Sequence, residues 1–442
     1  MANILYSGFG RESINPDFEV SLSGYGDNYK RPGLGRENTI YITCVAFRND
    51  EGKTLLVYTM DGLMANEPVA EALRDAIKEA GIDVPHDQIY ICATHCHNCP
   101  AIVTHLPHGQ EYRDFVMVQA VKAAKTALAD MAPTTLKLAK GQVPGMAFVR
   151  HYVMEDGSFA GVNYGDHTKG WKAHAAEADE TLILLQLVRE GAKDILMVNF
   201  QSHAAMAGDI GWYIISPDWV GHLRNDLERD TDMHVAYFNG ASGNQITRSN
   251  LKHEQHGLKF HEYGSKMAEY AMKLVPELKP IEGAELDNRH HMYVCKTNNA
   301  WDHMYKEAKE VFELWHNGDP INGGAKPADE LARSYGFSSR YQTWQILGAP
   351  NRKPTAEREM NVFRVGPVGF TTGTYEMSST EGIYVRANSP FDTTFILCGN
   401  QAYIPTSKAY DMRTYEGDTA PYLQGTAEAM ADKYLEMLRE IK

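Results

Sequence analysis

The chain has 442 residues, of which 43% are hydrophobic and 23% charged, enough for one large domain or two ordinary domains with a buried core. Its net charge of −14 argues against binding to nucleic acid or to anionic membranes, because both repel an acidic protein. No apolar run approaches the roughly 20 residues of a membrane helix, and the N-terminus lacks the pattern of a signal peptide. We therefore expect a cytoplasmic protein with reduced cysteines and no stable membrane association; whether it forms a homo-oligomer stays open.

The N-terminal half opens with a segment that is rich in glycine and turn residues. Residues 6–35 therefore favour an irregular entry segment or a short hairpin. The next three elements are clearer: an apolar strand over 53–62, an amphipathic helix over 66–81 and a second apolar strand over 87–94. A strand, a helix and a strand of these lengths predict a parallel pair with a crossover helix.

The remaining elements follow the same alternation of strands and helices. We expect a helix over 111–131, two strands within 180–203, a strand and a glycine-rich loop over 234–244, helical segments over 256–275 and 301–345, strands within 361–376 and 393–405, and a helix over 423–441. The pattern predicts an α/β fold: a mixed, largely parallel sheet flanked by helices. We expect one domain over 1–442, with a helical excursion at about 301–345.

Side chains that can bind a metal gather at the ends of the predicted strands. In open α/β sheets, ligands bind beyond the strand ends, where the rigid sheet holds the loops in place. The general polarity of loops explains any one such group but not so many of them. The groups are His95 with His97, His203, the loop 239–244, Glu376 and Tyr403. We expect these segments to assemble one site.

The segment ICATHCHNCP interleaves two histidines with two cysteines at a strand end. Residues two apart on a strand face the same side, so His95 and His97 suit one metal, or a ligand beside an acid–base group. The alternative is a pair of hydrogen-bonded loop histidines. We expect Cys96 to pack in the interior, because the strand that precedes it disfavours a redox C-x-x-C at a helix start. The role of Cys99 stays open.

Five segments resemble motifs of one known family, in the same order along the chain. They are GFGRESINP with GYGD, ATHCHNCP, NFQSHAAMAG with ISPDWVG, GTYEMSS, and SPFDTTFILCGNQAYIPTSKAYDMRTYEG. Together they cover residues 7 to about 417. The chain thus resembles the catalytic domain of the neutral/alkaline ceramidases, which are zinc-dependent amidases.

The resemblance implies a site for Zn²⁺ and assigns a role to each matching residue. The zinc ligands would be His95, His203, Glu376 and Tyr403, with His97 as the acid–base or oxyanion group, Tyr415 as a second polar contact and Arg150 as a substrate-side arginine. Zinc lowers the pKa of a bound water from about 16 to about 7 and polarises a carbonyl, which suits amide hydrolysis. These roles require the named residues to lie close together in the folded protein.

Two departures from the family pattern shape the predicted activity. The family's serine motif has no clear counterpart in GASGNQITRSN, so Ser242 or Thr247 is the candidate there, and metal-activated water is favoured over a serine nucleophile. The chain stops soon after YEG, without the family's C-terminal β-sandwich domain. We therefore predict hydrolysis of an amide (N-acyl) bond in a small soluble substrate.

Several alternatives stay open at this point. The same site suits an ester or lactone. An amidohydrolase-type barrel also begins with H-x-H after a strand, but Glu376 and Tyr403 at the pocket would exclude it. A metal-free hydrolase would use Ser242 or Cys99 as its nucleophile. A binding protein that keeps the fold without chemistry is the fourth alternative.

Overall fold

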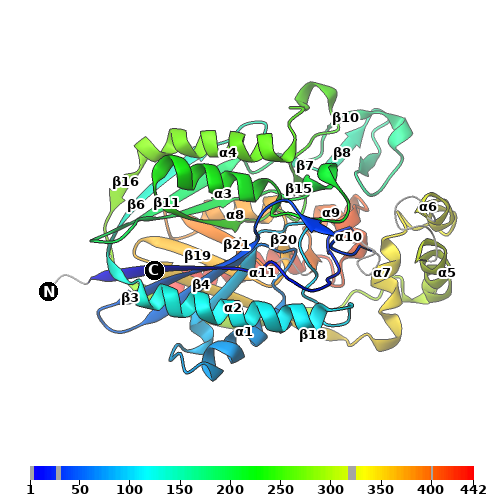
Figure 1. Ribbon diagram of the computed structural model, residues 1–442. Coiled ribbons are helices and arrows are strands. Elements are labelled where there is room, and N and C mark those ends of the chain that lie inside the picture. The colour runs from blue at the N-terminus through cyan, green and yellow to red at the C-terminus, as the bar shows by residue number, and fades with distance from the viewer. Residues whose placement is uncertain (1–3, 26–30, 317–324, 400–401) are drawn as a thin grey trace.

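The computed structural model describes residues 4–25, 31–316, 325–399 and 402–442, and its centre is a nine-stranded sheet (Figure 1). In spatial order its strands are β14 (His234–Asn239), β12 (Ile195–Phe200), β11 (Thr181–Arg189), β6 (Ala132–Gln142), β1 (Leu5–Ser13), β3 (Tyr41–Asn49), β4 (Thr54–Met60) and β5 (Ile89–Ala93), with β16 (Lys279–Ile281) paired to β6.

The predicted mixed sheet flanked by helices is confirmed, but the expectation that it is largely parallel is wrong. Among the described strands of this sheet, the pairs β4–β5 and β12–β14 are parallel, and the others are antiparallel. The strand–helix–strand unit was identified correctly. The two strands around the turn at 190–193 were also predicted, and they are antiparallel. The largely parallel sheet was wrong because short connections, such as the one over 50–53 between β3 and β4, make hairpins, which join antiparallel strands.

The glycine-rich opening begins with a central strand, β1, which was not predicted; the described residues between Ser13 and Gly35 are largely irregular, as expected. Strand β1 pairs with β3 on one side and β6 on the other. Its glycines lie under helix α2 (Gly109–Ala129): a Cβ added at Gly8 would lie 1.9 Å from the carbonyl oxygen of Ala127, and one at Gly10 2.0 Å from that of Ala123. These glycines therefore let the helix backbone approach the strand, which the sequence alone presents as turn composition.

We expect Gly10→Ala to destabilise the fold by about 1–3 kcal/mol, because its methyl group overlaps helix backbone that cannot move aside alone. Gly35→Ala is the matched control: Gly35 also lies in a strand, and the atom nearest to its added Cβ is a side-chain carbon 3.4 Å away. Urea denaturation measures both free energies of unfolding. Equal stability of the two variants would contradict this account of the α2–β1 contact.

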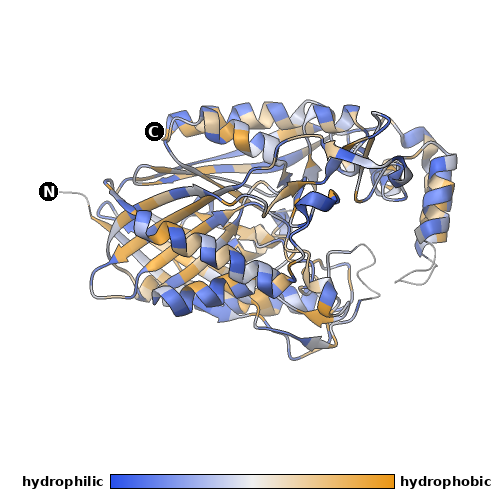
Figure 2. Cartoon of the chain, turned by 90° about the horizontal axis from the view of Figure 1, so that it is seen from above, coloured by the Kyte–Doolittle hydropathy of each residue, from blue (hydrophilic) through white to orange (hydrophobic). Residues whose placement is uncertain are grey.

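The strands of this sheet are apolar on both faces because both faces are covered. Along β4, Leu56 and Tyr58 face the helices, whereas Leu55 and Val57 face a second sheet. The helices on the first face are α1 (Glu67–Glu79), α2, α3 (Asp218–Thr231) and α4 (Phe260–Leu274). This double burial gives the continuous apolar runs from which the strands were predicted, and Figure 2 shows hydrophobic residues concentrated in these strands.

The second sheet has four strands and carries its own helices. They are β17 (Leu286–Lys296), β18 (Thr355–Val365), β19 (Val368–Gly373) and β21 (Thr394–Cys398), with α8 (Ser379–Asn388) and α11 (Thr426–Glu440) on the face away from the large sheet. Aromatic residues join the two sheets: the rings of Tyr90 and Phe363 stack 4.4 Å apart between centroids. The core is therefore two packed sheets with helices outside each of them.

Three helices between the last two long strands project from the end of the molecule opposite the termini (Figure 1). They are α5 (Tyr305–His316), α6 (Ala325–Ser334) and α7 (Gln342–Leu347), within the segment expected to be helical. Val311, Phe337 and Ile346 belong to a small hydrophobic cluster of their own. Among the described helices, none is both long and apolar enough to cross a membrane.

Short elements complete the chain around the ends of the strands. They are β2 (Gly35–Arg36) with β13 (Ile214–Ile215), β7 (Phe148–Val149) with β15 (Gln245–Ile246), β20 (Glu376–Met377) with β22 (Tyr403–Ile404), the three-stranded sheet β10 (Trp171–His174), β8 (His151–Met154) and β9 (Phe159–Gly161), and the helices α9 (Ser407–Asp411) and α10 (Tyr415–Thr419).

Candidate metal and catalytic site

Loops from opposite edges of the large sheet meet and bring three histidines together. His95 follows β5 at one edge, and His203 follows β12 near the other. The edges approach each other: the Thr59 hydroxyl donates to the carbonyl of Tyr237, 2.7 Å away, and Cys96 forms a β-bridge with Ala204. The two histidine segments, more than 100 residues apart in sequence, therefore lie side by side.

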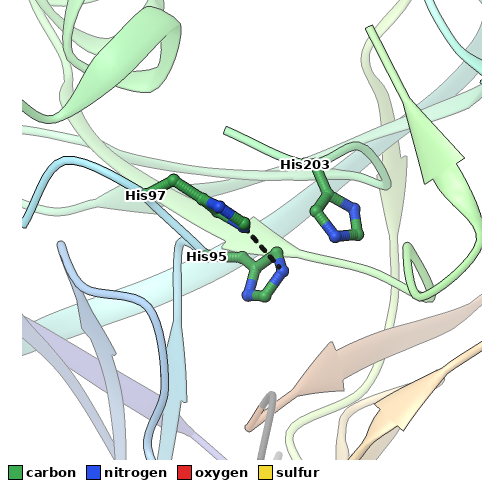
Figure 3. A group of neighbouring side chains, drawn as sticks. All are labelled: His95, His97 and His203. Carbon is green, nitrogen blue, oxygen red and sulfur yellow. Dashed lines mark hydrogen bonds between the residues drawn. The ribbon is translucent and has the colours of Figure 1, made fainter. Parts of the chain in front are cut away.

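His95 and His97 face each other, but not through the pleat of a strand. Strand β5 ends at Ala93, and His95 has a left-handed backbone with φ 59°. The nearest ring nitrogens, Nε2 of each residue, are 3.4 Å apart (Figure 3). The expectation of a shared side holds, while the strand geometry offered for it is wrong. A non-glycine residue in this conformation is strained, and such strain gathers at functional sites.

His95 and His203 are buried, and each directs its Nε2 toward the same point. Nδ1 of His95 donates to the carbonyl of Leu63, and Nδ1 of His203 donates to the carbonyl of Gln245. Each hydrogen bond is 2.9 Å long. With the proton on Nδ1, the neutral rings carry their lone pairs on Nε2. The ligand nitrogens of His95, His97 and His203 lie within 4.8 Å of one another, and Figure 3 shows the three rings together.

Glu376 completes this group from the second sheet. Its Oε2 lies 3.4 Å from Nε2 of His95 and 3.8 Å from Nε2 of His203. Glu376 is 6% exposed, and Oε2 has no hydrogen-bond partner among the described residues. Strand β20 pairs in parallel with β22, which sets Tyr403 directly beside Glu376. The structure thus brings together the residues expected as ligands.

Burial controls the protonation of these groups. It lowers the pKa of His95 to about 4 and those of His97 and His203 well below their ordinary value, with nearby cationic groups acting the same way. Burial raises the pKa of Glu376 to about 8, against the effect of Arg150. The imidazoles are therefore neutral at pH 7, the form in which histidine binds metals.

Arg150 lies at the back of the site, held in a fully occupied network. Its Nε donates to Oε1 of Glu416 over 2.5 Å, and its Nη2 to the carbonyl of Gly243 and the hydroxyl of Tyr403, 2.8 and 3.1 Å away. Its Nη1 lies 3.5 Å from Nε2 of His203. The guanidinium also lies over the rings of Tyr403 and Tyr415. Arg150 therefore connects the expected ligands to the expected polar contact Tyr415.

Sequence reasoning did not single out two members of this network. Oε2 of Glu416 accepts a hydrogen bond from Nε2 of His151, 2.6 Å away, while its Oε1 accepts from Arg150. His151 and Arg150 are both buried with Glu416. Burial acts to raise the pKa of Glu416, but Arg150 and His151 hold it well below its ordinary range. Both residues could have been found from their positions in the sequence, because Glu416 is the middle residue of YEG and His151 directly follows Arg150.

The GYGD segment supports His97 from outside. Gly24 has φ +111°, and an added Cβ would lie 2.6 Å from the Cα of His97. Arg31 was also missed by sequence reasoning. Its guanidinium carbon lies 4.7 Å from the ring centroids of both Tyr25 and Trp212, which stack on each other, and its Nη1 donates to the His97 carbonyl, 3.3 Å away. Residues 26 and 27 of GYGD lie outside the described ranges.

The two candidate nucleophiles, Ser242 and Cys99, are buried and contact neighbouring polar groups. Ser242 is 1% exposed, and its Oγ accepts a hydrogen bond from Nδ2 of Asn239. Cys96 and Cys99 are fully buried, and burial raises the pKa of both thiols. Both thiols lie near the carbonyl of Ser216, so Cys99 packs in the interior with Cys96.

Comparison with known proteins identifies the architecture. No protein-family model matches the chain, and no curated protein matches its sequence. Two solved structures match over 99% of the chain, each with a TM-score of 0.73 and 16% identity: a ceramidase complexed with C2 and the neutral ceramidase from Pseudomonas aeruginosa. The chain has the ceramidase fold. The match covers 75% and 74% of those ceramidase chains, respectively.

Each of the five segments brings at least one residue to the histidine group. These residues are Gly24 beside His97, the histidines His95 and His203, Glu376, and Tyr403 beside Glu376. At this level of identity the likeness establishes the architecture.

Proposed function

We propose that the chain is a zinc-dependent hydrolase that cleaves an amide (N-acyl) bond in a small soluble substrate. One observation carries the proposal: the lone pairs of His95 and His203 and a buried, unpartnered oxygen of Glu376 converge on one point. Nitrogen and carboxylate ligands in a group of three are typical of catalytic zinc, which keeps a further position for water or substrate.

The side chains at this point can satisfy one another less well than a metal ion could satisfy them. Burial raises the pKa of Glu376 to about 8, so the site disfavours the carboxylate when no cation is present; a cation at this point would stabilise the carboxylate and bind the two ring nitrogens. The backbone carbonyls at Nδ1 fix both imidazoles in the binding tautomer, as outer hydrogen bonds do in metal sites. His95, His203 and Glu376 would hold the ion, with Tyr403 or His97 as the further ligand.

Zinc, when bound, supplies a Lewis acid that polarises a carbonyl and makes water nucleophilic at neutral pH. The chain's own groups then bind and orient the substrate. Burial raises the pKa of the Tyr415 phenol, so it remains protonated and can donate to an oxyanion. His97 is neutral with an unpartnered Nδ1, and it can carry a proton to the leaving amine. Arg150 keeps Tyr403 in place.

A panel of N-acyl compounds, with ester and lactone analogues, tests the proposal. We expect turnover of amides, its loss after treatment with a chelator and its recovery on adding Zn²⁺, with about one zinc per chain in the purified protein. Faster turnover of esters or lactones would establish the alternative substrate class. Turnover that persists in metal-free protein would overturn the metal mechanism, and absence of turnover across the panel would favour a binding protein.

A further inference from the structure

Asp218 is a buried aspartate to which the proposed chemistry gives no role. It belongs to the ISPDWVG segment, is the first residue of α3 and is fully buried. Aspartate is almost never fully buried unless it is paired. The three hydrogen bonds that its carboxylate accepts come from backbone N–H groups rather than from a cationic side chain. The segments that supply these N–H groups therefore indicate what the carboxylate holds in place.

Two of the three donors lie in the loop over 203–207. Oδ2 of Asp218 accepts from the N–H of Met206, 2.7 Å away, and from the N–H of Ala207, 2.5 Å away. Its Oδ1 accepts from the N–H of Trp219, 2.7 Å away. The indole Nε1 of Trp219 donates to the carbonyl of the first residue of the loop, 3.2 Å away. Asp218 and Trp219, at the start of α3, therefore hold both ends of this loop.

The loop over 203–207 connects two of the three clustered histidines. Its first residue is His203, and the carbonyl of its second residue, Ala204, accepts from the N–H of His97, 2.9 Å away. A displaced loop would therefore move His203 and His97 together. His95 depends on the loop less, because its Nδ1 is bound to the carbonyl of Leu63 in a different segment.

Asp218 also has a backbone conformation that favours glycine. Its φ of 56° lies in the left-handed region, and its N–H donates to Oγ of Ser216, 2.9 Å away. A buried charge and a left-handed backbone are both unfavourable, and they persist at one residue only where the surrounding structure requires them. Burial raises the pKa of Asp218 to about 6, whereas the backbone N–H groups act to lower it, so the carboxylate predominates at pH 7.

We propose that Asp218 is a positioning residue, whose carboxylate fixes the loop over 203–207 and thereby the places of His203 and His97 relative to His95. The effect on the loop follows from the contacts of Asp218 alone. Its consequence for metal binding rests on the proposed function.

Hydrogen exchange of two histidine ring protons, followed by NMR on the purified full chain, tests the placement. The Nδ1 protons of His203 and His95 are each held in a hydrogen bond to a backbone carbonyl. Asp218→Gly removes the carboxylate and suits the left-handed backbone. We expect the His203 proton to exchange about tenfold faster in this variant, the value of one hydrogen bond to a charged group, and the His95 proton to change by less than about twofold.

Asp218→Asn keeps one oxygen acceptor, so its His203 proton should exchange at a rate between those of the parent and Asp218→Gly. If Asp218→Gly does not fold, the same selective change at His203 is required of Asp218→Asn. Equal acceleration of both histidine protons would show a general loosening of the fold, and unchanged exchange would show that the loop does not need the carboxylate. Either result would overturn the proposal.

Asp232→Gly is the matched control. Asp232 follows the last residue of the same helix, has a left-handed φ of 52° and has a side chain that is 96% exposed. This variant should leave both histidine protons unchanged. Acceleration at His203 as large as that in Asp218→Gly would contradict the role given to the buried carboxylate.

A competition titration with a zinc chelator measures the consequence for the proposed function. We expect Asp218→Gly to bind Zn²⁺ about tenfold more weakly than the parent, as when an outer partner of a metal ligand is lost, and Asp232→Gly to bind it equally well. Equal affinity in the parent and Asp218→Gly would overturn the link to the metal site. Selective exchange at His203 in a chain that binds no Zn²⁺ would support the positioning role and count against the zinc proposal alone.

Discussion

Replacing His95 or His203 with alanine is expected to reduce bound zinc to near zero and kcat/KM by roughly 1,000-fold or more. This fall corresponds to about 4 kcal/mol of transition-state stabilisation. The reason is geometric: each ring contributes one of the Nε2 atoms that face Oε2 of Glu376. Elemental analysis of the purified variants and kinetics on the best amide of the panel measure both effects.

His253→Ala is the control, because His253 has a side chain that is 77% exposed. It should keep full zinc and activity. His97→Ala decides the role of the third histidine: loss of zinc would make it a ligand, whereas retained zinc with a lower kcat would make it the proton carrier. The metal assignment fails if His95→Ala and His203→Ala keep their zinc and their activity.

Arg150→Met is expected to destabilise the fold by about 3–5 kcal/mol, the usual cost of leaving one member of a buried ion pair alone. Glu416 would then keep His151 as its partner but lose the guanidinium. The double variant Arg150→Met/Glu416→Gln should recover part of this loss, because no uncompensated carboxylate remains. Activity should fall in both variants, since each frees the Tyr403 hydroxyl from its donor.

The pH dependence gives this prediction a second readout. The folded-state pKa of Glu416 is held below its ordinary value of 4.5, so its contribution to stability is present above about pH 4.5 and is lost as the pH falls further. Denaturation curves should therefore show the parent approaching Glu416→Gln in stability below pH 4.5. Arg229→Met, at an exposed and solvent-screened ion pair, should leave stability nearly unchanged. Equal effects at both arginines would contradict the role given to burial.

Strands and helices with one clear periodicity were predictable from the sequence. The strand ends at Ala93 and Phe200, and helix α1 between its strands, follow from apolar runs bounded by caps and turns. Strand β1 did not follow, because Gly8 and Gly10 have the composition of a turn and serve instead to admit α2. The sequence predicted the parallel pair β4–β5 correctly but not the mainly antiparallel pairing of the rest of the large sheet, since that pairing depends on which strands meet in space.

The candidate site followed from the sequence to the extent that its groups lie at strand ends. His203 and Glu376 were expected on that ground, and the structure brings them beside His95. Glu416 and Arg31 were missed because their importance lies in buried contacts with Arg150 and with the His97 carbonyl. Such partners are visible only when segments distant in the sequence are packed together.

The separate hydrophobic cluster of α5, α6 and α7 affects which sequence changes this protein can accept during evolution. Val311, Phe337 and Ile346 support the helices from within, so substitutions on the outer faces of these helices need not disturb the two sheets. We therefore expect sequence changes to be tolerated more readily in α5, α6 and α7 than in the strands that carry the histidine group.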